Sequence, residues 1–294
     1  DTGFWDTFRS LFPLLNLVYP SANAEIQEGL LNTYRESGFF PEWASPGHRW
    51  CMVGNNSASV LADAFVKGIA FDDTELLYEG LQHGTRNVHP AVPSTGRLGH
   101  GLYNSLGYIP CDAGINENAA RTLEYAYDDW CVAQMARELG LEEDYARLMA
   151  MSKNYCNIFN KEEGFMLPRK YNGEWINLDN HNRTGLTEGS KWTYLFCAMH
   201  DVPGLIDLMG GNEAFAAKLD RNFKEGFYRH DNEPGHHYIY LYDWCGQPQK
   251  AQELVRHHTR VNYPNSPVVN GNDDCGQMSA WYIFSVMGFY PVAP

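Results

Sequence analysis

Helix-length segments, joined alternately by short turns and by longer polar loops, run through the whole chain and limit its fold more than any other feature. No series of strands alternating with helices is present, which argues against a parallel α/β sheet. The layout predicts helical hairpins arranged in a ring or a solenoid, within one α-helical domain spanning residues 1–294. We expect helices at residues 5–19, 21–37, 58–68, 73–84, 116–139, 142–157, 189–209, 212–226, 237–245, 248–261 and 276–287.

Two segments depart from the helical pattern. Residues 164–178 alternate between apolar and polar side chains around Asn172-Gly173, a dipeptide that favours tight hairpin turns. The stretch from Gly84 to Asp112 shows no clear period. We therefore expect a small β-hairpin at the first segment and a long irregular loop at the second.

Charge and aromatic content narrow the class of partner. A net charge of −14 argues against nucleic acid and against an anionic membrane surface, and it suits a neutral substrate or a cation. The 18 Tyr, 15 Phe and 8 Trp residues can fill a core, but such rings also line clefts that bind sugars. No apolar stretch approaches the length of a membrane span.

The seven cysteines and the two chain ends say little about the cellular compartment. The cysteines are well separated and form no CxxC pair, so the pattern fits neither a zinc site nor a dense disulfide framework. The chain begins without Met inside a helical pattern and stops just after another one. We therefore expect a fragment of a longer protein, in which a missing targeting sequence is uninformative.

Near the C-terminal end, a polar loop leads directly into an apolar helix. Asn272, Asp273 and Asp274 precede an apolar run from Met278 to Phe289. Acids at the start of a buried helix suggest chemistry, because a buried carboxylate is costly unless it is paired, metal-bound or catalytic. The alternative is a helix N-cap. A cap needs only one acid, however, and three oxygen-bearing side chains are present.

Two further loops carry polar residues where a ring of helices would present its open end. Glu188 lies at a helix start beside Gly189 and Trp192, where a glutamate favoured by the helix dipole is an equally good interpretation. The stretch from 230 to 237 holds several oxygen and imidazole side chains, and a solvated turn is its alternative reading. Oxygen ligands favour Ca²⁺ over Zn²⁺.

Carboxylates on separate loops are the minimal equipment of a glycosidase. Glu188 and Asp274 provide such a pair in a chain rich in acidic and aromatic residues. No glycine-rich phosphate loop and no GxSxG nucleophile motif is present. Hydrolysis of a sugar is therefore the reaction that these residues favour.

Several motifs, in order along nearly the whole chain, resemble glycoside hydrolase family 92. They are the segments 122–131, 187–192, 200–211, 232–237 and 271–291. Members of that family are calcium-dependent, inverting exo-α-mannosidases, mostly bacterial, with an N-terminal β-sandwich followed by an (α/α)6 barrel. The resemblance covers the barrel only, so it implies an (α/α)6 catalytic domain incomplete at its C-terminal end, with the β-sandwich missing. It also implies a periplasmic or secreted protein.

The resemblance assigns roles to single residues. It implies that Glu188 is the general acid, that Asp274 is the general base, and that Asn232 and Glu233 lie at the calcium ion. The remaining candidates match positions at the cleft, where we expect them to contact substrate: Asp6, His236, His237 and Asp273. For His236 and His237 the expected contact is the leaving-group sugar.

Three of the matched acids have a structural alternative. Asp6, Asp128 and Asp129 match cleft motifs, but each could equally be a buried structural carboxylate. The main effect of Asp273 is expected to come from local packing or hydrogen bonding. Departures from the family pattern at 54–56, 189–193 and 236–237 leave the linkage preference open.

Together these observations predict an enzyme that releases terminal mannose from α-mannoside glycans of the N-glycan or mannan type, with calcium. Two alternatives remain at this point. One is a non-catalytic fragment that binds mannose or another carbohydrate, and the other is an (α/α)6 glycosidase acting on another sugar.

Overall fold

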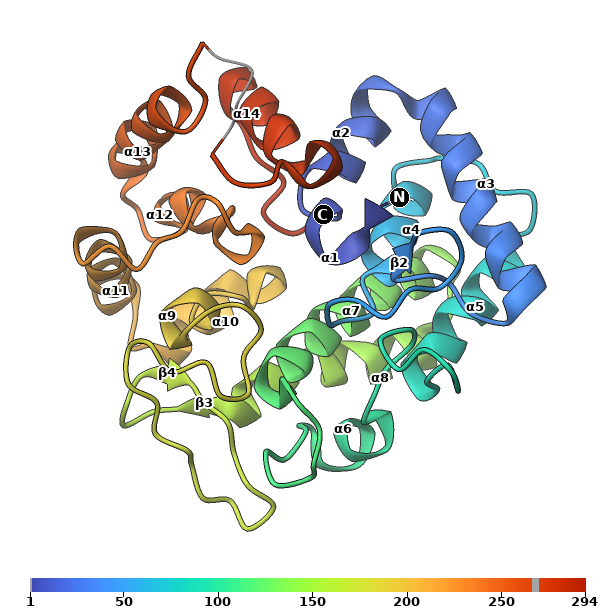
Figure 1. Ribbon diagram of the computed structural model, residues 1–294, viewed down its shortest axis with the longest axis horizontal. Coiled ribbons are helices and arrows are strands. Elements are labelled where there is room, and N and C mark those ends of the chain that lie inside the picture. The colour runs from blue at the N-terminus through green and yellow to red at the C-terminus, as the bar shows by residue number, and fades with distance from the viewer. Residues whose placement is uncertain (1, 266–269) are drawn as a thin grey trace.

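A computed structural model describes residues 2–265 and 270–294, and its regular structure is mostly helical (Figure 1). The α-helices are α1 (Phe4–Thr7), α2 (Leu11–Val18), α3 (Pro20–Ser37), α4 (Ser57–Val66), α5 (Thr74–Arg86), α6 (His100–Leu106), α7 (Asn118–Glu138), α8 (Glu142–Met151), α9 (Lys191–Tyr194), α10 (Val202–Leu208), α11 (Asn212–Lys224), α12 (Leu241–Trp244), α13 (Pro248–Val261) and α14 (Gln277–Met287). Short 3-10 helices are η1 (Ser152–Ile158), η2 (Met199–Asp201), η3 (Glu233–Gly235), η4 (Tyr238–Tyr240) and η5 (Asp274–Gly276).

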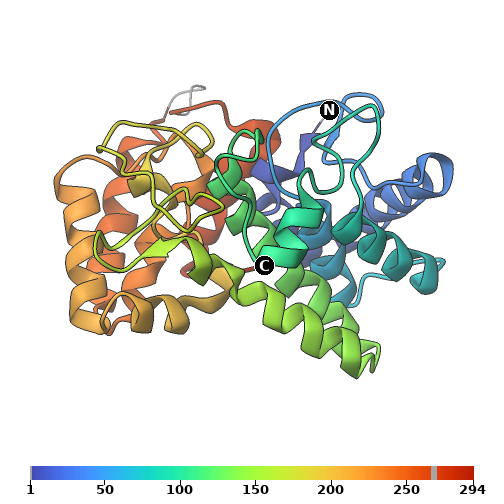
Figure 2. The ribbon, with the colours of Figure 1, turned by 90° about the horizontal axis from the view of Figure 1, so that it is seen from below.

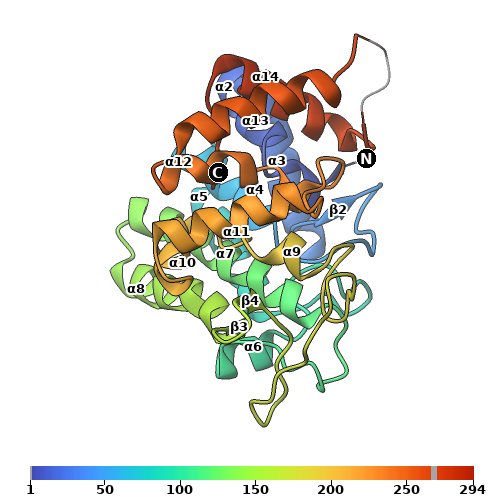
Figure 3. The ribbon, with the colours of Figure 1, turned by 90° about the vertical axis from the view of Figure 1, so that its left-hand side faces the viewer.

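The helices follow one another around a ring. Helix α7, the longest, packs against α4 and α8 on the right-hand and lower part of Figure 1. Figures 1 and 3 both place α14 beside α2, and the two helices are in contact. This contact joins the last described helix to the beginning of the chain and closes the ring.

Aromatic side chains fill the interior of the ring. Trp5, Trp192 and Trp281 are among the largest side chains with almost no exposed surface. The Trp192 ring stacks on Phe227, with ring centroids 4.6 Å apart, and meets Phe165 edge-on at 4.8 Å. Much of the aromatic content therefore serves the core rather than a sugar-binding surface.

Two predicted helices are each interrupted in the structure, and in both cases the helix that follows has a proline in its first turn. The segment 5–19 forms α1 and α2, with Pro13 in the first turn of α2. The segment 189–209 forms α9, η2 and α10, with Pro203 in the first turn of α10. Proline lacks the N–H that a continuous helix needs, but the first turn leaves that group unpaired in any case.

The segment from Gly84 to Asp112 is not wholly irregular. It contains α6 (His100–Leu106), which lies between Gly99 and Gly107, both in the left-handed conformation. The helix is only two turns long, and its flanking glycines rather than a long apolar period mark its ends.

The predicted β-hairpin is present in a modified form. Strands β3 (Phe159–Asn160) and β4 (Phe165–Met166) pair antiparallel, so the pairing begins before residue 164. Around Asn172-Gly173 the chain turns back on itself through a single bridge between Arg169 and Trp175. Strands β1 (Thr2–Gly3) and β2 (Trp43–Ala44) form a second short antiparallel pair.

The long connecting segments gather on one face of the ring. Figure 2 shows them along its upper edge, beside the N-terminal end, with most helices below them. Loops of this kind carry the polar residues of a site on a helical scaffold. Within the described parts of the chain, no helix combines the length and the apolar character needed to cross a membrane.

Candidate active site

Three carboxylates from distant parts of the chain meet at one point. Asp6 comes from α1, Glu233 from η3 and Asp274 from η5, and one carboxylate oxygen from each lies within 4.8 Å of the others. Asp6 and Glu233 are buried, and Asp274 is half-buried. We call these three residues the carboxylate cluster.

Asp6 is placed by the strand pair that precedes its helix. Gly3 pairs with Trp43, and a Cβ atom at Gly3 would lie 2.2 Å from the Trp43 ring, so only glycine allows this approach. Helix α1 starts at the next residue and directs Asp6 into the interior. Burial raises the pKa of Asp6 to about 7; Asp274 adds to the rise, and Arg9 partly opposes it.

The loop that carries Asp274 has an unusual backbone. Asp273, Asp274 and Cys275 all have positive φ angles, of 60°, 42° and 60°. Three consecutive non-glycine residues in this region are costly, and such backbones concentrate at functional sites. Nearby, a Cβ atom at Gly271 would lie 3.2 Å from the Asp231 backbone, so glycine lets this loop approach the segment that carries Glu233.

Asp273 and Asp274 point to different partners. The Asp273 Oδ1 atom accepts hydrogen bonds from the backbone N–H of Ser279 (2.9 Å) and from the Ser279 hydroxyl (3.0 Å). Asp273 therefore stabilises the first turn of α14, whereas Asp274 joins the carboxylate cluster. Of the two roles that the sequence left open, Asp273 takes a helix-stabilising one, although Gly276 rather than Asp273 is the N-cap of α14, and Asp274 joins the candidate site.

Glu233 and Asn232 both hold buried oxygen atoms without a partner. Among the described residues, neither Glu233 Oε1 nor Asn232 Oδ1 accepts a hydrogen bond. Burial raises the pKa of Glu233 well above its ordinary value, and the nearby carboxylates of Asp274 and Asp6 raise it further. An uncompensated group of this kind is expected where a cation or a substrate hydroxyl binds.

Glu188 lies beside this group and is exposed. The amide Nδ2 of Asn232 donates to Glu188 Oε2 at 3.0 Å. Glu188 has a positive φ of 55°, as Asp274 does. On one side the Tyr194 hydroxyl donates to the Thr187 carbonyl at 2.8 Å, and on the other Ser190 caps α9. Glu188 is therefore held on a constrained turn at a helix start.

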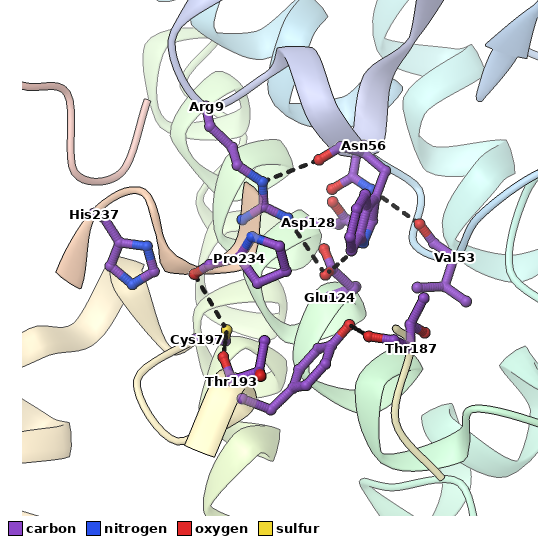
Figure 4. A network of polar contacts seen from close by, with 12 residues as sticks. Arg9, Val53, Asn56, Glu124, Asp128, Thr187, Thr193, Cys197, Pro234 and His237 are labelled. Carbon is purple, nitrogen blue, oxygen red and sulfur yellow. Dashed lines mark hydrogen bonds and ion pairs between the residues drawn. The ribbon is translucent and has the colours of Figure 1, made fainter. Parts of the chain in front are cut away.

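A buried network lies beneath these loops (Figure 4). The Trp5 indole donates to Glu124 at 3.1 Å, and Arg9 reaches toward the same carboxylate, with 3.9 Å between Nη2 and Oε1. The Cys197 thiol contacts the Pro234 carbonyl at 3.9 Å, which links the segment after α9 to η3. The network joins the segments that carry Asp6, Glu188 and Glu233.

The structure places His236 and His237 behind the site rather than at the cleft. Their exposed fractions are 0% and 2%, and each Nε2 lies at a backbone carbonyl, of His230 and Phe196 respectively. Burial lowers the pKa of each imidazole to about 3. In this arrangement neither side chain is open to a sugar, which argues against the expected substrate contact.

Asp128 and Asp129 are structural carboxylates of α7. Asp128 Oδ2 accepts from the backbone N–H of Asn55 at 2.8 Å. Asp129 forms a buried ion pair with Arg97 at 2.6 Å and accepts from the Tyr103 hydroxyl at 2.8 Å. Asp129 is thus paired through both oxygens, whereas Asp128 keeps a buried Oδ1 without a partner among the described residues. Neither belongs to the carboxylate cluster, which Asp6 joins.

The donor set fits a hard divalent cation. Asp6, Glu233 and Asp274 offer carboxylate oxygens, and Asn232 offers an amide oxygen. Calcium takes six to eight oxygen ligands, usually completed by water or by substrate hydroxyls. Two of the available oxygens are buried without a partner, and within residues 2–265 and 270–294 no Cys or His joins the cluster, so the residues fit calcium better than zinc.

A polar cavity of about 230 Å³ adjoins Glu188. Its lining includes Glu188 and Asn232 but no member of the carboxylate cluster, and Asn232 is the neighbour in sequence of the cluster residue Glu233. The remaining walls include Asn180, Arg183 and Arg229. A larger cavity of about 820 Å³, lined by residues such as Trp130 and Trp244, contains none of these acids and has no link to this chemistry.

The whole chain, residues 1–294, matches the glycosyl hydrolase family 92 catalytic domain. The chain belongs to this family. The family 92 domain is also similar in sequence to a protein of the fungus Arthroderma benhamiae described as an uncharacterized secreted glycosidase, with 30% identity over 89% of this chain and 38% of that protein.

Solved structures agree with this membership. The domain is similar to an inverting mannosidase of family 92 from Bacteroides thetaiotaomicron, with a TM-score of 0.93 and 42% identity over 99% of this chain and 43% of that one. An α-mannosidase of the same organism, solved with mannoimidazole, gives 0.92 and 35% over 99% and 41%. The expected (α/α)6 barrel is confirmed. The chain spans less than half of the length of these relatives.

Two residues at the site were not found from the sequence. Arg9 and Gln277 are fully or almost fully buried and touch the segments that carry the cluster. Gln277 lies within the segment 271–291 that resembles family 92, and this resemblance was the only sequence signal that could have identified it. Its importance depends on contacts with residues far away in the chain, and a local pattern does not contain them.

Proposed function

We propose that this family 92 domain hydrolyses terminal α-mannosidic bonds with inversion of configuration, assisted by calcium. The observation that carries the proposal is the carboxylate cluster, which lies beside Glu188 and contains oxygen atoms without partners. Its similarity to family 92 mannosidases supports mannose as the sugar.

We assign the roles of general acid and general base to Glu188 and Asp274, which lie in different surroundings. Glu188 is exposed and next to the polar cavity, so it is placed to donate a proton to the glycosidic oxygen. Asp274 would accept a proton from a water molecule on the opposite face of the sugar. Inversion then requires the two carboxyl groups to stand roughly 6.5–9.5 Å apart, which leaves room for that water.

Asn232, Glu233 and Asp6 are the residues that would hold calcium next to Asp274. A bound calcium ion would attract hydroxyl oxygens of the terminal sugar and offset the charge of the cluster. The residues themselves orient the site: Asn232 binds Glu188 through its amide nitrogen, which leaves its oxygen free to face a cation.

The cavity beside Glu188 would receive the leaving group. A general acid acts between the sugar that is cleaved off and the rest of the substrate, and Glu188 lines this cavity while its partner Asn232 adjoins the cluster residue Glu233. The walls of the cavity are polar, which suits a second sugar unit. In this proposal the leaving group binds in the cavity beside Glu188 and does not contact the buried His236 and His237.

Release of free mannose tests the proposal. We expect hydrolysis of at least one of α-1,2-, α-1,3- and α-1,6-mannobiose, loss of activity with EDTA, and recovery with added calcium. Proton NMR during the first turnovers should show β-mannose as the initial product, because inversion converts the α-linkage. An initial α-anomer would exclude inversion. Mannose binding without any release would favour the non-catalytic alternative.

The compartment is a further part of the proposal. The fungal relative is described as secreted, and we propose an extracytoplasmic location for the protein that contains this domain. Fractionation of the source cells, followed by detection with an antibody, would test it. Recovery in the cytosolic fraction alone would exclude it.

A further inference from the structure

Gln277 uses every hydrogen-bonding position of its side chain. It is the first residue of α14 and is completely buried. Its Oε1 atom accepts from the backbone N–H groups of Ser10 (3.0 Å) and Leu11 (3.1 Å). Its Nε2 group donates to the Ser10 hydroxyl (2.6 Å) and to Nδ1 of His236 (3.1 Å). A primary amide offers two acceptor positions and two donors, and all four are used here.

The partners of Gln277 lie just after the three members of the carboxylate cluster. Ser10 follows Asp6 by four residues, and His236 follows Glu233 by three. Gln277 itself follows Asp274 by three residues. One amide therefore connects the three segments that bring the acids together, although these segments lie near the start, in the last quarter and near the end of the chain.

The orientation of this amide is determined by its partners. Backbone N–H groups can only donate, so the side of the amide that faces Ser10 N and Leu11 N must be the oxygen. His236 directs its Nε2 at the His230 carbonyl, which requires a proton there and leaves Nδ1 as an acceptor. The buried His236 thus accepts a hydrogen bond from Gln277, and this contact accounts for the position of His236 behind the site.

A second contact reinforces the same connection. The Trp281 indole, one turn further along α14, donates to the backbone carbonyl of His236 at 2.9 Å. Helix α14 is thereby bound to the segment of Glu233 through both a side chain and a backbone group. The link to Ser10 depends on Gln277, because the Gln277 side chain and backbone carbonyl are the partners of the Ser10 N–H and hydroxyl.

We infer that Gln277 is the positioning residue of the carboxylate cluster, and that it sets the spacing of Asp6, Glu233 and Asp274 at which a divalent cation binds. The inference rests on the calcium site of the proposed function. Glu233, almost fully buried with an unpartnered Oε1 atom, supplies an independent indication that a ligand completes this cluster. Residues that orient metal ligands typically contribute roughly 10- to 100-fold to metal affinity.

Calcium binding by isothermal titration calorimetry tests this inference, with the full chain as wild type and as Gln277→Met. Methionine has a similar length and shape but makes none of the four hydrogen bonds. We expect calcium affinity to fall by roughly 10- to 100-fold in Gln277→Met. Ser10→Ala removes only the hydroxyl contact, so it should weaken binding less. It also provides the decisive measurement if Gln277→Met does not fold, as judged by circular dichroism.

Gln27→Met is the matched control. Gln27 is also completely buried and donates to Asn23 at 3.1 Å, in α3. A loss of stability from any buried amide would appear in both Met variants, but only Gln277→Met should change calcium affinity. If Gln277→Met folds and binds calcium as tightly as the wild type, the inference is overturned and the proposed function is left intact. If Gln277→Met does not fold, unchanged calcium affinity in Ser10→Ala has the same consequence. Absence of calcium binding in the wild type would overturn both.

Discussion

Asp129 and the carboxylate cluster lie in the same domain and both include buried acids, but among the described residues only Asp129 forms an ion pair with a cation. The Arg97 guanidinium is 2.6 Å from Asp129, and neither side chain is exposed. Burial alone would lower the pKa of Arg97, but Asp129 and Asp128 raise it above its ordinary value. Among the described residues, no Arg or Lys forms an ion pair with Asp6, Glu233 or Asp274.

The difference separates a structural from a functional use of buried charge. A paired carboxylate can stabilise the folded state or at least keep it unique, and removing its partner is costly. Three acids within 4.8 Å of one another repel, so the folded state tolerates them only because other contacts hold the segments in place. This arrangement is expected of a site rather than of a stabilising ion pair, and the predictions below test the contrast.

The largest expected effect concerns Asp274. Asp274→Asn should lower kcat by several orders of magnitude, on the order of 10³-fold or more, while mannose affinity is retained, because the amide cannot accept a proton from water. Asp273→Asn is the control, since Asp273 bonds to Ser279 instead of joining the cluster. It should cost turnover far less. An inactive Asp273 variant beside a normal Asp274 variant would reverse the assignment.

Glu188→Gln should give the next largest effect. We expect a loss of roughly 10²- to 10⁴-fold on natural mannosides, because the variant cannot donate a proton to the leaving oxygen. An aryl mannoside with a good leaving group should retain much more activity, since it needs less protonation. Steady-state rates on both substrate classes provide the comparison. Equal losses on the two classes would show that Glu188 is not the acid.

The free energy of unfolding should respond differently when the acid is replaced at Asp129 and at Asp6. Asp129→Asn leaves Arg97 without its partner and should lower the free energy of unfolding by about 3–5 kcal/mol. Asp6→Asn removes one repelling charge, so it should leave the calcium-free protein at least as stable as the wild type. Urea unfolding in EDTA measures both variants. A large loss in Asp6→Asn would mean that the cluster supports the fold.

The smallest effect is a pH dependence of the calcium-free protein. The pKa of Asp6 is raised to about 7 and that of Glu233 is also raised, so the folded state holds protons that the unfolded chain releases. Stability is then greatest below about pH 4 for these groups and is lost as the pH rises toward 7 and above. The buried imidazoles of His236 and His237 act in the opposite sense, because their lowered pKa makes the folded state less stable as the pH falls below about 6.5. The test is therefore a comparison with Asp6→Asn in EDTA: the value of Tm at pH 5 minus Tm at pH 8 should be higher in the wild type than in the variant by roughly 3–6 °C.

Calcium should reduce the loss of Tm that the cluster causes with rising pH, because a bound cation offsets the ionised carboxylates. We call this change of Tm with pH the slope. Glu42, outside the cluster and also buried with a pKa raised to about 7, adds a part of the slope that calcium does not remove. Scanning calorimetry at the two pH values, with and without calcium, separates the contributions. A slope that calcium leaves unchanged would contradict a cation site at the cluster.

Local patterns in the sequence determined the positions of several helices and two of the candidate catalytic acids. Helical periods located α3, α7, α11, α13 and α14 to within a few residues, whereas the predicted helix 142–157 continues beyond α8 as the 3-10 helix η1; the polar loops identified Glu188 and Asp274 as candidates. These features depend on residues that are neighbours along the chain, so a window of one or two helical turns contains them. The divided helices at Pro13 and Pro203 were within reach of the same reasoning.

Only the tertiary structure decided which acids act together. Asp6 and Asp274 come from opposite ends of the chain and meet because α14 packs against α2 and Gln277 binds Ser10. The contacts of α14 also enclose His236, and the packing of α7 against α4, α5 and α8 buries Asp129, although the residue types of both suit a site equally well. Burial and distance depend on how the ring closes, and a local sequence pattern carries no measure of either.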